Sequence, residues 1–100
     1  MTLAVVFHPL AELELEDAVL YYEHESSGLG RAFLTEFRLS LEWILAHPSA
    51  GTPIVEALRR RSMSRSPYAL IYQAAPTHLY VLAVANHHRR PFYWGDRQAR

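Results

Sequence analysis

The side chains that could do chemistry lie mostly in the second half of the chain, where cationic and aromatic residues alternate. The cationic set is Arg59, Arg60, Arg61, Arg65, His87, His88, Arg89 and Arg90, and the aromatic set is Tyr68, Tyr72, Phe92, Tyr93 and Trp94. Guanidinium groups hold phosphates and carboxylates in a forked geometry, and aromatic rings stack on bases or anchor protein partners. The mixture indicates an RNA-binding or a protein-binding surface, and for the cluster by itself we favour protein binding.

Other kinds of site find little support in the sequence. The chain has six histidines, but only His87 and His88 are adjacent, and neighbouring residues of a strand point to opposite faces. There is no His-Glu-x-x-His motif, no phosphate loop, no nucleophile elbow and no cysteine. We therefore expect no metal and no cofactor.

Charge is divided between the two halves of the chain. Residues 1–56 hold nine acids and two arginines, a net charge of −7, whereas residues 57–100 hold eight arginines and one acid, a net of +7. The division predicts either internal neutralisation between an acidic helical layer and a basic sheet, or a basic surface for an anionic partner. We expect Arg97 to be a candidate for pairing with an acid of the helical hairpin, and either Arg89 or Arg90 to be a candidate for pairing with an acid of the first helix.

Hydrophobic periodicity predicts the elements that position these residues. Residues 3–7 read as a strand, and residues 10–25 and 30–47 carry apolar stripes at helical spacing. The short Ser-Ser-Gly-Leu-Gly link between them predicts a helical hairpin with Gly28 in a left-handed conformation. Residues 57–63, 68–74 and 79–85 read as three further strands, after a loop at residues 49–56.

The order β-α-α-β-β-β predicts an α+β fold, a helical hairpin packed on a small antiparallel sheet. Alternation along residues 57–63 should put Leu58, Arg60 and Ser62 on one face of the sheet. Arg59, Arg61 and Met63 should lie on the other face. We expect Trp94 to close the end of the core, with its N–H satisfied near the surface.

Length and hydropathy limit the kind of protein. One hundred residues predict a single domain spanning residues 1–100. No apolar run approaches the ~20 residues of a membrane-spanning helix, and the N-terminus lacks the basic region of a signal peptide. We therefore expect a cytoplasmic protein that does not bind membranes.

Several short motifs follow one another along the chain. They are Tyr21-Tyr22-Glu23, Gly28-Leu29-Gly30, Arg60-Arg61, the run Pro67-Tyr68-Ala69-Leu70-Ile71-Tyr72, and the ending Arg89-x-Pro91-x-Tyr93-Trp94-x-x-Arg97. Taken together and in this order, they resemble the RelE/ParE superfamily of toxins from type II toxin–antitoxin modules. The resemblance covers almost the whole chain. It implies the same fold and a hetero-oligomer in which a cognate antitoxin neutralises the toxin.

The superfamily has two main activities, and the resemblance implies different residues for each. RelE-like toxins cut mRNA on the ribosome without a metal; here the matching residues would be Arg60, Arg65, His87 and Tyr93. ParE-like toxins inhibit DNA gyrase and are not known to cut RNA; here Arg60, Arg61, Arg89, Arg90, Tyr93 and Trp94 would contact the target or the antitoxin.

Ala69 and the C-terminal motif favour the ParE-like alternative. In the ribonuclease branch a basic residue stands where this chain has Ala69, and Ser62 stands where a second is expected on the preceding strand. Phosphoryl transfer needs positive charge at the reacting phosphate. We therefore expect a gyrase inhibitor first, a ribosome-dependent ribonuclease second, and a decayed toxin that binds only its antitoxin third.

Overall fold

A computed structural model describes residues 3–97 of the chain. Its elements are β1 (Ala4–Phe7), α1 (Pro9–Glu25), α2 (Leu29–Ala46), β2 (Thr52–Pro53), β3 (Leu58–Ser62), β4 (Tyr68–Ala74) and β5 (His78–Asn86). The predicted order is confirmed, and the expected loop at residues 49–56 contains the short strand β2. Among these residues no helix is both long and apolar enough to cross a membrane.

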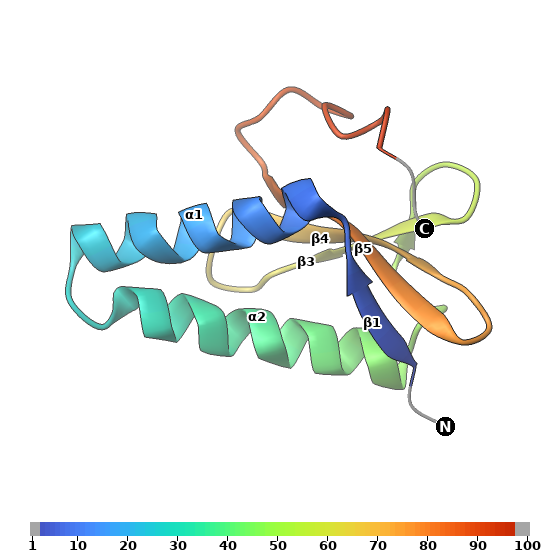
Figure 1. Ribbon diagram of the computed structural model, residues 1–100, viewed down its shortest axis with the longest axis horizontal. Helices are drawn as coiled ribbons and strands as arrows, with labels where there is room; N and C mark the ends of the chain where they lie inside the picture. Colours follow the sequence, from blue (N-terminus) through green and yellow to red (C-terminus); the bar gives the residue numbers. More distant parts are fainter. Residues whose placement is uncertain (1–2, 98–100) are drawn as a thin grey trace.

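The five strands form one sheet in the order β1-β5-β4-β3-β2. β3, β4 and β5 are antiparallel neighbours, as expected, whereas β1 pairs with β5 in parallel. The α+β prediction is therefore confirmed, with a sheet that is mixed rather than purely antiparallel. Figure 1 shows both helices side by side over one face of the sheet, with the strands behind them.

Local capping explains where the two helices begin and end. His8 accepts a hydrogen bond from the Leu10 amide at 3.1 Å, and Pro9 occupies the first turn, where its missing N–H has no partner to lose. Gly28 adopts the predicted left-handed conformation with φ +92°. The Glu23 carboxylate of α1 then accepts from the Gly28 and Gly30 amides, so that one helix caps the start of the next.

The main core lies between the helices and the sheet. Its fully buried side chains come from both helices and from β4 and β5, and include Ala11, Ala18, Phe33, Phe37, Ile44, Leu70, Tyr72, Leu79, Val81 and Val84. The apolar stripes predicted from helical periodicity provide the side of this core that comes from the helices.

A second, smaller core lies on the opposite face of the sheet. It consists of Ile71, Leu82, Ala83, Ala85 and Trp94, with Ile54, Leu58 and Tyr93 packed around it. A bulge between Ile71 and Tyr72 shifts the β4–β5 register, which brings both Leu82 and Ala83 to this face. Residues 87–97, which we call the strap, follow β5 and cover this face, with Trp94 only 5% exposed. Trp94 is therefore buried as expected, but it covers this second core and not the end of the main one.

Candidate functional site

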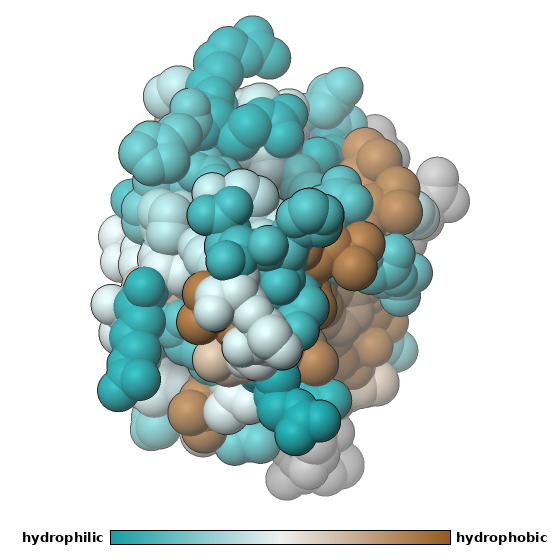
Figure 2. Space-filling view, turned by 90° about the vertical axis from the view of Figure 1, so that its left-hand side faces the viewer, coloured by the Kyte–Doolittle hydropathy of each residue, from teal (hydrophilic) through white to brown (hydrophobic). Residues whose placement is uncertain are grey.

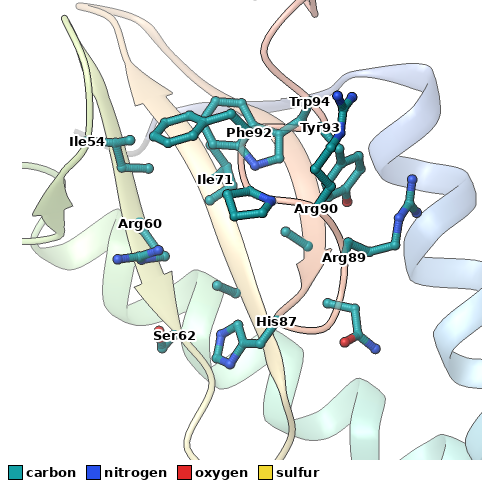
Figure 3. Close-up of a pocket in the computed structure, with 14 residues that line it drawn as sticks. Ile54, Arg60, Ser62, Ile71, His87, Arg89, Arg90, Phe92, Tyr93 and Trp94 are labelled. Atoms are coloured by element: carbon teal, nitrogen blue, oxygen red, sulfur yellow. The ribbon is translucent and has the colours of Figure 1, made fainter.

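A cavity of about 400 Å³ opens between the strap and the face of the sheet that the helices leave free. Its walls come from the loop before β3, from β3, β4 and β5, and from the strap, as Figure 3 shows. The lining residues are Ile54, Arg60, Ser62, Ala69, Ile71, Ala85, Asn86, His87, Arg89, Arg90, Pro91, Phe92, Tyr93 and Trp94.

The strand register explains why the floor of the cavity is apolar. Ser62 pairs with Ala69, and Ala69 pairs in turn with Ala85, so that these side chains form one row across β3, β4 and β5. The adjacent row begins with Arg60 opposite Ile71. Ala69, 1% exposed, therefore lies at the centre of the floor and brings no charge there.

The rim of the cavity is cationic. Arg60 brings charge to it from β3, and Arg89 and Arg90 bring charge from the strap on the other side, where the His87 imidazole also lies (Figure 3). No carboxylate is found among the lining residues. A rim of one sign around low-dielectric walls concentrates a positive potential, which favours phosphates or acidic side chains.

Phe92 is the exposed aromatic residue at this rim. Its side chain is 58% exposed, and its ring centroid lies 5.4 Å from that of Trp94. Its φ of 59° places a non-glycine residue in the left-handed region, at a conformational cost of about 1 kcal/mol. The surrounding contacts of the strap therefore hold Phe92 in this exposed position against a local preference.

Tyr93 and Arg97 connect the strap to α1 through Glu14. The Tyr93 hydroxyl donates to Glu14 Oε2 at 2.7 Å, and Arg97 donates to both carboxylate oxygens at 2.9 and 2.8 Å. The expected pairing of Arg97 with an acid of the helical hairpin is confirmed, and it is the only ion pair within residues 3–97. Neither Arg89 nor Arg90 makes such a pair there; Arg89 lies 4.0 Å over the Tyr93 ring instead.

These contacts shift the ionisation of both partners. Burial by itself raises the pKa of Glu14, but hydrogen bonds from Arg97, Tyr93 and the Val84 amide, with the charge of Arg97, outweigh it and hold this pKa below 4.5. Burial and the Glu14 carboxylate raise the pKa of Tyr93 far above its ordinary value. The Tyr93 hydroxyl therefore keeps its proton and donates it in the hydrogen bond to Glu14. In this state the hydroxyl is a poor proton acceptor.

Six of the eight sequence-predicted site residues line the cavity: Arg60, His87, Arg89, Arg90, Tyr93 and Trp94. Arg61 and Arg65 do not. Alternation along β3 places Arg61 against α2, where its guanidinium lies 3.7 Å from the Trp43 ring centroid. Arg65 lies in the turn after β3, beside a separate groove of about 760 Å³ along α2, where its amide donates to Glu36. Their proposed roles stay predictions.

One contributor, Glu14, was not expected from the sequence. Glu14 stands in an alternating run of acids that reads as an ordinary helix surface, and nothing local distinguishes it from Glu12 or Glu16. Phe92 belongs to the aromatic set named from the sequence, but no role was assigned to it there; the structure places it at the rim. No group of three or more His, Asp or Glu side chains able to hold a metal occurs in the described part of the chain.

A known protein family matches most of the chain. The family model described as ParE toxin of type II toxin-antitoxin system, parDE, matches residues 5–91. Tyr93, Trp94 and Arg97 therefore lie beyond the matched residues. No curated protein matches the chain.

A solved structure described as the chromosomal ParDE TA system from P. aeruginosa contains a chain of similar fold. The two chains superpose with a TM-score of 0.73 at 13% identity, over 85% of this chain and 96% of that chain. At this identity the likeness concerns the fold.

Proposed function

The chain belongs to the ParE toxin family of type II toxin–antitoxin systems, and we propose that it acts without catalysis, by inhibiting DNA gyrase in the cytoplasm. In this proposal the cavity and its rim form the contact surface for a macromolecular target. Arg60, Arg89 and Arg90 contribute charge, and the strap contributes an aromatic contact at its exposed end.

The apolar floor of the cavity is the observation that carries the choice of a non-enzymatic mechanism. Phosphoryl transfer requires charge directed at the reacting phosphate and a group that takes up a proton. At the centre of the floor stands Ala69, and the nearby Tyr93 hydroxyl already donates to Glu14. The rim can bind an anion, but the floor offers little help to a reaction.

A supercoiling assay with purified gyrase and relaxed plasmid tests the proposal. We expect the wild-type protein to reduce supercoiling at micromolar concentration, and Arg90→Ala to need about ten times more protein. Arg38→Ala is the matched control, because Arg38 is an exposed arginine on α2 outside the cavity. Unchanged supercoiling and no trapped cleavage complex with the wild-type protein would contradict the proposal.

A ribosome-dependent ribonuclease is the second candidate, because Arg60 and His87 line the same cavity. The residues for this activity would be Arg60, Arg65, His87 and Tyr93, of which Arg65 lies outside the cavity. The test is cleavage of mRNA in the ribosomal A site by the purified protein. Cleavage that His87→Ala abolishes would support this alternative; cleavage that survives both His87→Ala and Tyr93→Phe would contradict these assignments.

A cognate antitoxin is the second partner that we propose. Its neutralising segment should be amphipathic and acidic, since the cationic rim favours carboxylates and apolar side chains remain exposed on the helices. The large exposed apolar residues of the helices are Leu10, Leu13, Leu20 and Tyr21 on α1 and Leu29 and Leu39 on α2. Figure 2, which looks onto the end of the hairpin, shows such brown patches among the teal polar surface.

Co-expression with the neighbouring small open reading frame tests this partner. We expect a stable hetero-oligomer whose formation relieves growth inhibition. If induced expression of the chain alone does not slow growth, the result would favour the decayed toxin. If the two proteins do not co-purify, the result would contradict the antitoxin proposal.

A further inference from the structure

One carboxylate on α1 connects three separate parts of the fold. Glu14 Oε1 accepts from the Val84 amide at 3.0 Å and from Arg97 at 2.9 Å; Glu14 Oε2 accepts from Tyr93 at 2.7 Å and from Arg97 at 2.8 Å. The side chains of Arg97 and Glu14 are only 8% and 15% exposed. Four donors occupy the carboxylate, so its geometry is fixed from several directions.

The Val84 amide is available to Glu14 because β1 is short. β1 ends at Phe7, which pairs with Val81, and beyond that point no described strand lies along this edge of β5. Arg97 uses the same edge, since it donates to the Leu82 carbonyl at 3.2 Å. The Glu14–Arg97 pair thus takes the place of strand pairing at this edge and attaches the end of the strap there.

The strap is held at both ends and in its middle. At its start the His87 amide donates to the Pro67 carbonyl at 2.7 Å, and at its end Arg97 binds Glu14. Trp94 is buried between them. Arg89, Arg90 and Phe92 are exposed, so their positions at the rim depend on these attachments.

We propose that Glu14 is a positioning residue for the cavity: it fixes the strap across the edge of β5 so that Arg89, Arg90 and Phe92 stand at the rim in one arrangement. This inference rests on the proposed function only for the identity of the target, DNA gyrase. A buried ion pair adds little net stability compared with an apolar contact, but it selects one geometry, which suits this role. The charge of Glu14 therefore acts on the target through the strap and not by contact.

Hydrogen–deuterium exchange of the full chain tests the positioning without any target. Glu14→Gln preserves size and removes the charge, and Glu16→Gln on the exposed side of the same helix is the control. We expect Glu14→Gln to speed exchange at the strap amides bonded within the strap about tenfold more than at the amides of α2 and β4, whose exchange follows only the loss of global stability. The strap amides are those of Tyr93, Gly95 and Arg97.

Two outcomes of the exchange experiment would overturn the positioning role. Equal acceleration throughout the chain would show that Glu14 supports global stability only. No acceleration in the strap would show that Trp94 and the His87 amide hold it without help from Glu14.

A double-mutant cycle in the supercoiling assay tests the effect on function. Arg90→Ala should raise the half-inhibitory concentration about tenfold in the wild-type background but less than about threefold in the Glu14→Gln background. The reason is that Glu14→Gln already displaces Arg90 from the rim, so that its removal costs little further binding. Equal factors in both backgrounds would overturn the coupling. If the wild-type protein does not inhibit gyrase, the proposed function fails, and the exchange experiment still decides whether Glu14 positions the strap.

Discussion

At the scale of single residues, the ionisation of Glu14 makes stability depend on pH. Because the pKa of Glu14 is lower in the folded protein than the ordinary 4.5, its contribution is complete above that value and is lost as the pH falls through the folded pKa. At pH 7 we expect Glu14→Gln to lower the free energy of unfolding by about 2 kcal/mol. The difference from wild type should shrink below about pH 4.5.

Urea unfolding at pH 7 and at successively lower pH measures this difference. Glu16→Gln, which changes the same charge at an exposed position, should leave the acid limb of the stability curve in its wild-type form. A Glu14→Gln protein whose stability runs parallel to wild type down to pH 3 would contradict the assignment.

The consecutive arginines of β3 should separate binding from stability. Arg60 is exposed at the rim of the cavity, whereas Arg61 stacks on Trp43 beneath α2. We expect Arg60→Ala to weaken gyrase inhibition several-fold while it changes the free energy of unfolding by less than about 0.5 kcal/mol. Arg61→Ala should lower that free energy by about 1 kcal/mol, through loss of the cation–π contact and its packed stem.

Thermal unfolding and the supercoiling assay, run on the same two variants, check this separation. The reverse pattern, with Arg61→Ala weakening inhibition at unchanged stability, would place the contact surface on the helix side of the sheet. It would also restore Arg61 as a direct target contact.

At the scale of elements, the helical hairpin depends on a close approach at Gly30. A Cβ added there would lie 2.7 Å from the Val19 carbonyl oxygen, a backbone atom that cannot move without shifting α1. We expect Gly30→Ala to lower the free energy of unfolding by about 2 kcal/mol or more. Gly28→Ala is the comparison, because its surroundings are open and only its φ of +92° disfavours alanine, by about 1 kcal/mol.

Denaturant unfolding of both variants ranks the two effects. The prediction is that steric contact at Gly30 outweighs backbone conformation at Gly28. A larger loss at Gly28→Ala would mean that α1 and α2 can separate at low cost, and that the hairpin link and not the close contact fixes their packing.

Elements formed by local patterns were predictable, and contacts between distant segments were not. Period-2 alternation correctly separated Arg60 from Arg61, and the glycine-rich link predicted the hairpin and the conformation of Gly28. The parallel pairing of β1 with β5 and the hydrogen bonds of Glu14 join residues 70 to 83 positions apart. Such contacts depend on how the finished layers meet, and no local pattern around Glu14 encodes them.

The same reasoning explains what the sequence indicated about the site. The basic residues of β3 and the strap were recognisable as a set, and four of them, Arg60, His87, Arg89 and Arg90, line one cavity. Tyr93 was a candidate for catalysis because it matches a tyrosine that the resemblance to RelE-like toxins implies. Its role depends on the partner of its hydroxyl, which lies 79 residues away on α1, so only the tertiary structure reveals it.

At the scale of the whole molecule, the charge division of the sequence becomes a division between layers. The acids lie mostly on the helices, and the cationic rim lies on the opposite face of the sheet. Only one ion pair joins the two layers within residues 3–97. The charges of the two layers are therefore largely not paired with each other. The positive potential of the basic face remains available to attract an external partner.

This polarity predicts how the association rate with an acidic antitoxin depends on salt. Long-range attraction is screened beyond about 10 Å at 0.1 M salt and beyond about 3 Å at 1 M, so the association rate constant should fall about tenfold or more between low and high salt.

Arg60→Ala with Arg90→Ala should flatten this dependence, because both side chains lie at the rim. Arg31→Ala with Arg38→Ala removes the same charge from α2, beside the exposed leucines of that helix, and is the comparison for the rim variant. Stopped-flow binding to the product of the adjacent reading frame measures all three proteins. An equal loss of salt dependence in both double variants would mean that net charge alone steers the encounter, whereas a loss confined to the rim variant locates the docking face at the cavity.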